Sequence, residues 1–253
     1  MVASCHLSVE LSKWQLFLLY ERGVNMMKKF VTLFKKPVVY VSSLLTLFLA
    51  SLIIILALFM GQEAGNFVIE IEAGDVSKNL HITETLSDEN YYSRLQAGSF
   101  EGMSHSTYGR FQNRLETYKD AQGVYIDKER HVYAYTFYIL NNNEESLDLQ
   151  ATMYYSNVTN ELDTAIRVMT ITEELGMRCY QAPDEIPTDY GADYPEIFYF
   201  ESKDIVYEET YLTFEPGTYI KYTVLFWLEG NDIDCNDDRR LGTIRFSLKL
   251  SIL

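Results

Sequence analysis

The stretch TIRFSLKLSI, residues 243–252, alternates between polar and apolar side chains at every position. Ile244, Phe246, Leu248, Leu250 and Ile252 occupy the apolar positions. Because successive side chains of a β-strand point to opposite sides of the sheet, the two kinds of residue would separate onto two faces. The stretch therefore predicts a strand with one face on a hydrophobic core and the other in water.

Similar runs recur through the second part of the chain and are separated by turn residues. They are rich in β-branched and aromatic residues, as strands are. No ten-residue helical pattern lies between successive runs, which disfavours a parallel α/β sheet. We therefore predict a mainly β domain, an antiparallel β-sandwich, with strands near 66–72, 131–140, 147–155, 165–172, 196–201, 205–214 and 219–228.

The segments between the runs predict specific turns and one or two short helices. NNNEES, residues 141–146, is expected to close a hairpin between two neighbouring runs. In EPGT, Pro216 and Gly217 stand where a type II turn places its two central residues. Helix-like patterns occur in LSDENYYSRLQAG, residues 86–98, with Ser87 as a candidate N-cap, and in YGRFQNRLETYKD, residues 108–120.

An apolar segment precedes the β-rich part. Residues 38–60, VVYVSSLLTLFLASLIIILALFM, contain no charged side chain. At about 1.5 Å per residue a helix of this length reaches roughly 35 Å, enough for a hydrocarbon core of about 30 Å. A cleaved signal peptide is the alternative, but the segment is longer than a usual signal core and MGQEAGNF, residues 60–67, offers no clear cleavage site. A retained single transmembrane helix is favoured.

Charge is distributed unevenly around this segment. Residues 1–36 carry six Lys and Arg against two Glu, a net charge of +4. Because the whole chain has a net charge of −15, the residues after 36 carry −19. The positive-inside rule then predicts a type II arrangement in the cell membrane: a cytoplasmic segment 1–36, a transmembrane helix 37–60 and an extracytoplasmic domain 61–253. Met26 and Met27 offer an alternative start, which would make residues 1–25 a wrongly assigned extension.

The acidity of the large domain bears on its partners. Such a surface repels phosphate backbones, so the sequence argues against nucleic-acid binding. It suits cations, basic partners or simple solubility.

The acidic segment FWLEGNDIDCNDDRRLG, residues 226–242, is the best candidate for a metal site. Acidic and amide residues at alternate positions resemble the opening of a calcium-binding loop, whose oxygen atoms converge on Ca²⁺. An EF-hand is excluded, because its sixth position would be Asp237 instead of Gly and its twelfth Thr243 instead of Glu. A different calcium site and a loop neutralised by Arg239 and Arg240 both remain open. The candidate ligands are Asp232, Asp234, Asn236, Asp237 and Asp238.

Cysteine placement leaves two alternatives. Cys5 precedes the apolar segment, whereas Cys179 and Cys235 follow it. On the outer side of a membrane this pair could form a disulfide, which would contribute about 4 kcal/mol in the chain-entropy treatment. Two unpaired thiols are the other interpretation.

Catalytic motifs are not evident. His81, His105 and His131 stand apart and lack the spacing of zinc ligands. Ser104, next to His105, is not a catalytic triad, because a triad is assembled across a fold. We therefore expect no enzyme activity and no cofactor other than the candidate Ca²⁺. The many tyrosines fit core packing, with a glycan-binding surface as the alternative.

Several short features resemble a known group of bacterial surface proteins. These are the lysine-rich start followed by one apolar segment, GNF at 65–67, PGT-x-x-x-YTV at 216–224 and the closing amphipathic strand. They are similar to TasA, camelysin and spore-coat-associated proteins. AIRVMTI, residues 165–171, and FWLEGNDIDCNDD, residues 226–238, also resemble segments of uncharacterised membrane-anchored proteins of Firmicutes.

The resemblance implies a jelly-roll-like sandwich at the cell surface, and some members of the group assemble into extracellular fibres. No catalytic residue carries over from it. We therefore expect a membrane-anchored, non-catalytic protein that self-assembles or binds a cell-wall or protein partner. The alternatives are a surface module that binds glycan or calcium and, third, a camelysin-like protease.

Overall fold

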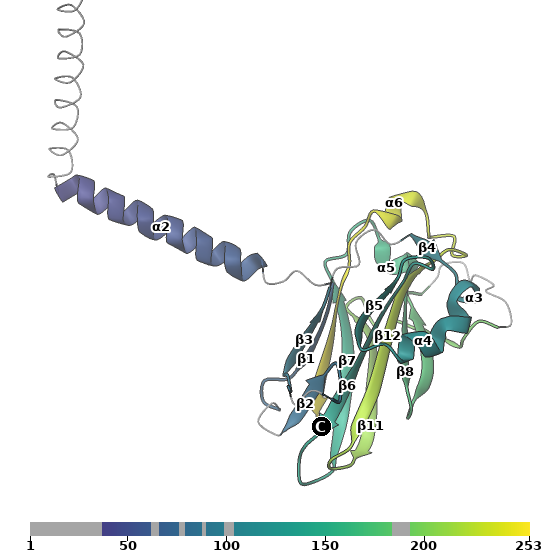
Figure 1. The fold of residues 1–253 in the computed structure, drawn as a ribbon. Coiled ribbons are helices and arrows are strands. Elements are labelled where there is room, and N and C mark those ends of the chain that lie inside the picture. The colour runs from purple at the N-terminus through teal and green to yellow at the C-terminus, as the bar shows by residue number, and fades with distance from the viewer. Residues whose placement is uncertain (1–36, 62–65, 76–78, 88–89, 99–103, 184–192) are drawn as a thin grey trace, which may run out of the picture. The chain divides into compact units, whose positions relative to one another are not determined.

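The computed structural model describes residues 37–61, 66–75, 79–87, 90–98, 104–183 and 193–253 (Figure 1). The segment 1–36, for which a basic cytoplasmic role and a second start site were predicted, lies outside these residues. Contacts divide the chain into two units, Met1–Glu63 and Ala64–Leu253. Each unit is described by itself.

In the first unit, α2 (Pro37–Gly61) is a helix of 25 residues. Its side chains are described from Tyr40 to Ile54, where the large apolar ones are exposed, as Leu47 is at 70%. The Thr46 hydroxyl donates to the Ser42 carbonyl one turn earlier, over 2.9 Å, so its polar group is satisfied within the helix. Among the residues described, no helix is both long enough and apolar enough to cross a membrane. The membrane-spanning helix at 37–60 therefore stays a prediction.

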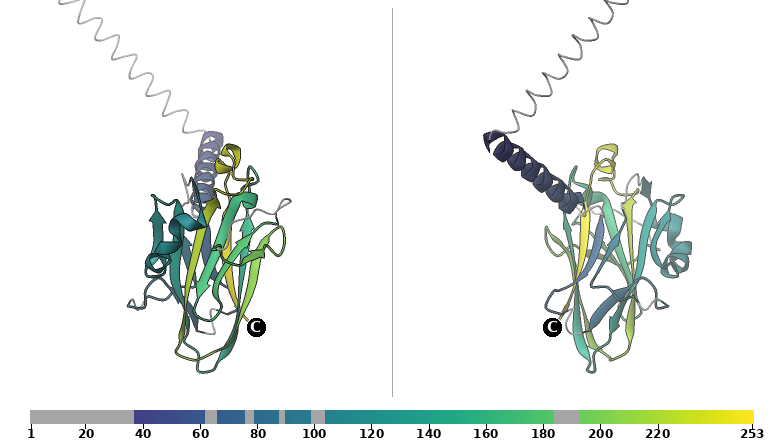
Figure 2. Two further views of the ribbon diagram at one scale, coloured as in Figure 1. Left: turned by 90° about the vertical axis from the view of Figure 1, so that its right-hand side faces the viewer. Right: turned by 60° about the vertical axis from the view of Figure 1, so that its left-hand side comes forward.

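The second unit is mainly β, as predicted, and its strands form two sheets that face each other (Figures 1 and 2). The smaller sheet has the strand order β11 (Ile205–Phe214), β7 (Leu147–Ser156), β13 (Arg245–Ile252), β1 (Phe67–Ile71) and β3 (Arg94–Ala97). The larger has the order β10 (Ile197–Tyr199), β9 (Gly176–Gln181), β8 (Ile166–Thr172), β12 (Tyr219–Glu229), β6 (Val132–Asn141) and β2 (Leu80–Thr83). To this sheet β4 (His105–Ser106) adds beside β12, and β5 (Gly123–Asp127) beside β6.

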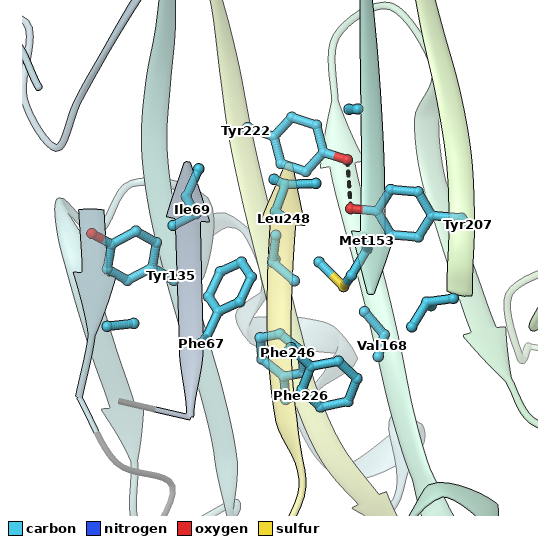
Figure 3. Close-up of a cluster of buried hydrophobic side chains, with 14 of the residues drawn as sticks. Phe67, Ile69, Tyr135, Met153, Val168, Tyr207, Tyr222, Phe226, Phe246 and Leu248 are labelled. Atoms are coloured by element: carbon cyan, nitrogen blue, oxygen red, sulfur yellow. Dashed lines mark hydrogen bonds between the residues drawn. The ribbon is translucent and has the colours of Figure 1, made fainter. Parts of the chain in front are cut away.

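The final strand fills the role that its alternation predicts. Phe246, Leu248 and Leu250 of β13 are fully buried between the sheets. Figure 3 shows Phe246 packed beside Phe226 of the facing sheet and near Phe67, with ring centroids of Phe226 and Phe246 4.7 Å apart. Most strand pairs are antiparallel, although β1 runs parallel to β13, β4 to β12 and β10 to β9.

Two connections lie at the same end of the sandwich and cross from one sheet to the other. The hairpin predicted for 141–146 is wrong, because β6 belongs to the larger sheet and β7 to the smaller. The type II turn at Pro216 and Gly217 is confirmed: Gly217 has φ +70° and the Thr218 N–H donates to the Glu215 carbonyl over 3.3 Å. The Gly217 N–H also donates to the Asn141 carbonyl over 2.7 Å, which joins the two crossovers.

The helical predictions have mixed outcomes. Within 86–98, residues Arg94–Ala97 form β3, because Leu95 and Ala97 alternate with exposed neighbours and pack into the core. A helix beginning at Ser87 is therefore wrong. The second prediction is confirmed by α3 (Tyr108–Phe111), η2 (Gln112–Arg114) and α4 (Leu115–Lys119).

This helical segment covers the outer face of the larger sheet (Figure 2). Phe111 and Tyr118 are fully buried in a second hydrophobic cluster, separate from the core between the sheets, and Phe111 packs on Trp227. The centre of β12 is consequently buried on both faces. This explains why its sequence, YTVLFWL at 222–228, is continuously apolar in its second half instead of alternating.

Candidate functional site

The acidic loop joins β12 to β13 and contains the short helix α6 (Asp237–Arg240). Its first carboxylate, Asp232, points inward and forms an ion pair with Arg167 of β8; the two side chains are 1% and 0% exposed. Arg167 also donates to the carbonyls of Thr164, over 3.1 Å, and Ile166, over 3.2 Å. A buried charge is tolerated only when its partners replace water, as they do here. The Asp232 carboxylate is therefore committed to a structural ion pair.

The other predicted ligands of the loop have separate partners. Asp234 forms an ion pair with Arg239, whose second nitrogen lies 2.9 Å from Glu161. The Asn236 side chain accepts from the Arg239 N–H over 3.0 Å and so caps α6. Asp237 and Asp238 occupy the first turn of α6, where the helix dipole favours negative charge. The loop therefore has the geometry of the salt-bridged alternative.

No group of three or more His, Cys, Asp or Glu side chains in the described part of the chain is placed to hold a metal ion. The calcium site at Asp232, Asp234, Asn236, Asp237 and Asp238 gains no support from the geometry and stays a prediction.

Two glycines fix the ends of the loop. A Cβ on Gly230 would lie 2.9 Å from the His105 ring and 3.1 Å from the Ser106 carbonyl oxygen. A Cβ on Gly242 would overlap the carbonyl oxygen of Thr159 and come within 2.9 Å of that of Arg239. Because glycine has no side chain, the backbone can approach closely at both positions. One end of the loop thus lies against His105 and Ser106, and the other against Thr159.

The two cysteines of this unit are free thiols, so the predicted disulfide is not formed in this structure. Cys179 is fully buried in the cluster on the outer face of the larger sheet, whereas Cys235 packs against the core between the sheets. Their different locations explain why they are not joined. Burial raises the pKa of Cys179 to about 12, so its thiol stays protonated at neutral pH and is a poor nucleophile.

Glu229 is fully buried beside the outer-face cluster that contains Cys179 and Trp227. Its carboxylate accepts from Trp227 Nε1 over 2.9 Å, from the Tyr194 hydroxyl over 3.0 Å and from the Asn231 N–H over 3.2 Å. Burial, followed by the influence of Cys179 and Glu229, raises the pKa of Tyr194. The Glu229 carboxylate is therefore satisfied by hydrogen bonds inside the fold.

Glu209 of β11 is a further buried carboxylate and lies between the sheets. It accepts from the hydroxyls of Tyr180 over 2.6 Å, Tyr222 over 2.8 Å and Tyr211 over 3.1 Å. Tyr222 also shares a 2.8 Å hydrogen bond with Tyr207, as Figure 3 shows. Burial, then the nearby Glu209, raises the pKa of Tyr180, so its hydroxyl remains a donor. The Glu209 cluster, meaning Glu209 with these four tyrosines, links the two sheets by polar contacts inside the core.

Sequence reasoning missed the burial of Glu209 and Glu229. For Glu209 there was a signal, because Tyr207, Glu209 and Tyr211 recur at every second position of one strand. A glutamate that shares a strand face with two aromatics faces the core. Many tyrosines do pack in the core, Tyr133 and Tyr135 among them, while others, such as Tyr219, are exposed.

The three histidines predicted not to form a zinc site lie on different elements. His81 on β2 stacks on Tyr91 with ring centroids 5.2 Å apart, His105 lies on β4 and His131 precedes β6 with φ +54°. Ser104 and Ser106 flank His105 along the chain, and the Ser106 carbonyl accepts from the Gly230 N–H. The three histidines thus belong to different parts of the fold.

Comparisons with family models, with curated proteins and with solved structures find no match to this chain. The resemblance to TasA and camelysin proteins thus stays a prediction.

Proposed function

We propose that the protein is a membrane-anchored protein of the bacterial cell surface whose β-rich unit acts by binding or assembly and not by catalysis. The anchor would be residues 37–60, a charge-free apolar segment that follows a basic one. The strongly acidic remainder would lie outside the cell, in agreement with the positive-inside rule. A jelly-roll-like connectivity and a tendency to form fibres, both implied by the resemblance, belong to the same proposal.

The non-catalytic role rests on one observation: the buried carboxylates are engaged in hydrogen bonds and an ion pair within the fold. Asp232 is paired with Arg167, Glu209 is surrounded by tyrosine hydroxyls and Glu229 accepts from Trp227. Catalytic groups must reach a substrate and change their protonation during turnover. Side chains that are fully enclosed and fully occupied by structural partners serve stability instead, which favours a rigid sandwich that displays a surface.

The anchoring part is tested by localisation of the full chain with a tag after Leu253. We expect the chain in the membrane fraction after an alkaline wash, and we expect protease added to intact cells to remove the tag. Replacing Leu49 and Ile53 by Arg should release the chain, because each buried cation costs about 2.5 to 3.5 kcal/mol on the insertion scale. Ser51→Ala is the matched control and should stay in the membrane. A soluble chain, or a tag protected in intact cells, would overturn the proposal.

The interaction part is tested with the purified chain in detergent. Light scattering that reports multimers, compared with detergent alone, would support self-assembly. A persistent monomer that captures a wall or protein partner would support binding, whereas cleavage of casein abolished by a point substitution would establish an enzyme and contradict the proposal.

A further inference from the structure

A cleft of about 270 Å³ opens at the end of the sandwich where the sheets exchange strands. One wall is the end of β11 and the start of β12, and the other is the turn between β8 and β9. Because β11 belongs to one sheet and the other three strands to the second, the cleft lies on the seam between the sheets.

The centre of the cleft is apolar and exposed. Leu212 is 64% and Tyr219 53% exposed, and Phe214 is buried beneath them. The Tyr219 ring packs edge-on against Tyr138, with centroids 5.5 Å apart. An aliphatic and an aromatic side chain in one concavity favour a ligand that covers apolar area, at about 25 cal/mol for each Å².

The rim of the cleft is acidic. Glu173 and Glu174 come from the β8–β9 turn and Glu215 from the β11–β12 turn. Within the described residues no ion pair is found for these three carboxylates. The one lining cation, Lys221, lies 3.6 Å from Asp120 outside the cleft. A ligand that enters the cleft therefore meets uncompensated negative charge beside apolar surface.

The wall formed by β11 is held in an unusual backbone conformation. Thr213 has φ +55°, in the left-handed region, where a β-branched residue costs about 1 to 3 kcal/mol. Its N–H donates to Asp148 over 2.8 Å, and the pairing of β11 with β7 is interrupted between Tyr211 and Phe214. The next turn is fixed by the Thr218 hydroxyl, which donates to the Glu215 carbonyl over 2.7 Å. The cleft is thus shaped before any ligand arrives, which reduces the entropy lost on binding.

We propose that this cleft binds a basic peptide segment of a partner protein. The aliphatic stem of a Lys or Arg side chain would lie on Leu212 and Tyr219, and its charged head would reach the carboxylates of the rim. A neutral glycan would leave these three charges uncompensated, and an acidic ligand would be repelled. The inference deepens the interaction role proposed above and rests on it.

The test uses the full chain in a non-ionic detergent and a fluorescein-labelled probe, acetyl-Gly-Arg-Val-Arg-Gly-amide. We expect saturable binding by fluorescence anisotropy that weakens with salt, and no binding of the peptide in which Glu replaces Arg. The double variant Glu173→Gln/Glu174→Gln should bind about tenfold more weakly, because two exposed ion pairs are worth up to about 1.4 kcal/mol together. Leu212→Ser should also weaken binding, whereas Leu212→Met, which keeps an apolar side chain, should bind the probe as the parent does.

The matched control is Glu144→Gln/Glu145→Gln, which makes the same change in net charge in the neighbouring crossover loop. It should leave the affinity within about twofold of the parent. An equal loss in this control would mean unspecific attraction and would overturn the proposal, as would the absence of saturable binding or displacement of the probe by a neutral oligosaccharide. None of these outcomes affects the localisation assay, so failure of the cleft and failure of the proposed function can be distinguished.

Discussion

Arg167 and Asp232 form an ion pair from which water is excluded, although 65 residues separate them along the chain. Removing one member leaves the other charge buried without its partner. We expect Asp232→Ala to lower the free energy of unfolding by about 3 to 5 kcal/mol, measured by denaturant titration. The double variant Arg167→Met/Asp232→Leu should recover much of this loss, since neither charge remains.

The control for this pair is Asp238→Asn, which changes an exposed carboxylate of the same loop. It should alter the free energy of unfolding by less than about 1 kcal/mol. Equal effects of Asp232→Ala and Asp238→Asn would contradict the structural role of the buried pair.

The glycines at the ends of the acidic loop give a second prediction. Gly242→Ala should destabilise the protein by about 1 to 3 kcal/mol, because the new Cβ would overlap backbone oxygens that cannot rotate away. Gly230→Ala should cost less, since one of its two close contacts is a side chain, that of His105. In Gly109→Ala the new Cβ meets nothing within 4 Å, and this helical control should keep or slightly raise the melting temperature.

The Glu209 cluster gives a third prediction. Glu209→Gln keeps the shape of the side chain but places an amide N–H₂ among hydroxyl donors, so we expect a loss of about 2 to 3 kcal/mol in the free energy of unfolding. Tyr222→Phe should cost about 1 to 2 kcal/mol through its lost hydroxyl. Tyr219→Phe, on an exposed ring of the same strand, serves as the control and should be nearly neutral. A Glu209→Gln protein as stable as the parent would show that the cluster does not hold the sheets together.

The cysteines are tested by alkylation in a Cys5→Ser background. At pH 8 the native protein should leave Cys179 unmodified by iodoacetamide, because the thiol is buried and its pKa is raised to about 12. Unfolding in denaturant should expose it to full modification. Detection of a Cys179–Cys235 linked peptide by mass spectrometry without reductant would refute the free thiols.

The long strands could be predicted from the sequence because each carries its own pattern. β13 alternates over its whole length, and β6, β7, β11 and β12 each have ten residues or more. β2, β3, β4, β5 and β9 were not predicted as strands, because each has six residues or fewer and shows no long alternation of its own. In β9, Cys179 faces the outer cluster, while Arg178 on the other face lies over the Phe198 ring. Because both faces of β9 pack against other side chains, its sequence does not alternate between apolar and polar residues.

Contacts between distant residues were the least predictable part. The segment 141–146 has the composition of a hairpin loop, and composition does not reveal whether the two strands share a sheet. The aspartates of the acidic loop suggested a metal site, because the sequence shows their spacing and not the arginine that pairs with one of them. Arg167 lies in a strand whose outer face is covered by a segment from elsewhere in the chain. Only the folded topology brings it to Asp232.

Asp127, at the end of β5, gives a prediction about pH. Burial would raise its pKa, but hydrogen bonds from the Tyr118 hydroxyl and from the Arg130 and Glu129 N–H groups, with the Arg130 charge, hold the pKa below its usual range. A carboxyl group whose pKa is lower in the folded state contributes stability above its unfolded pKa of about 3.9, and this contribution is lost as pH falls through the folded value. Asp127→Asn should therefore be less stable than the parent at pH 7, and the difference should shrink below about pH 4.

Tyr118→Phe is the matched variant, since it removes the 2.9 Å hydrogen bond to the same carboxylate and leaves its charge in place. The free energy of unfolding of Tyr118→Phe should depend less on pH than that of the parent. The change should be smaller than the change caused by Asp127→Asn. Denaturant titrations of the three proteins at pH 7 and pH 3 measure the effect. Parallel pH profiles for the parent and Asp127→Asn would mean that the hydrogen bonds around Asp127 do not favour its ionised form.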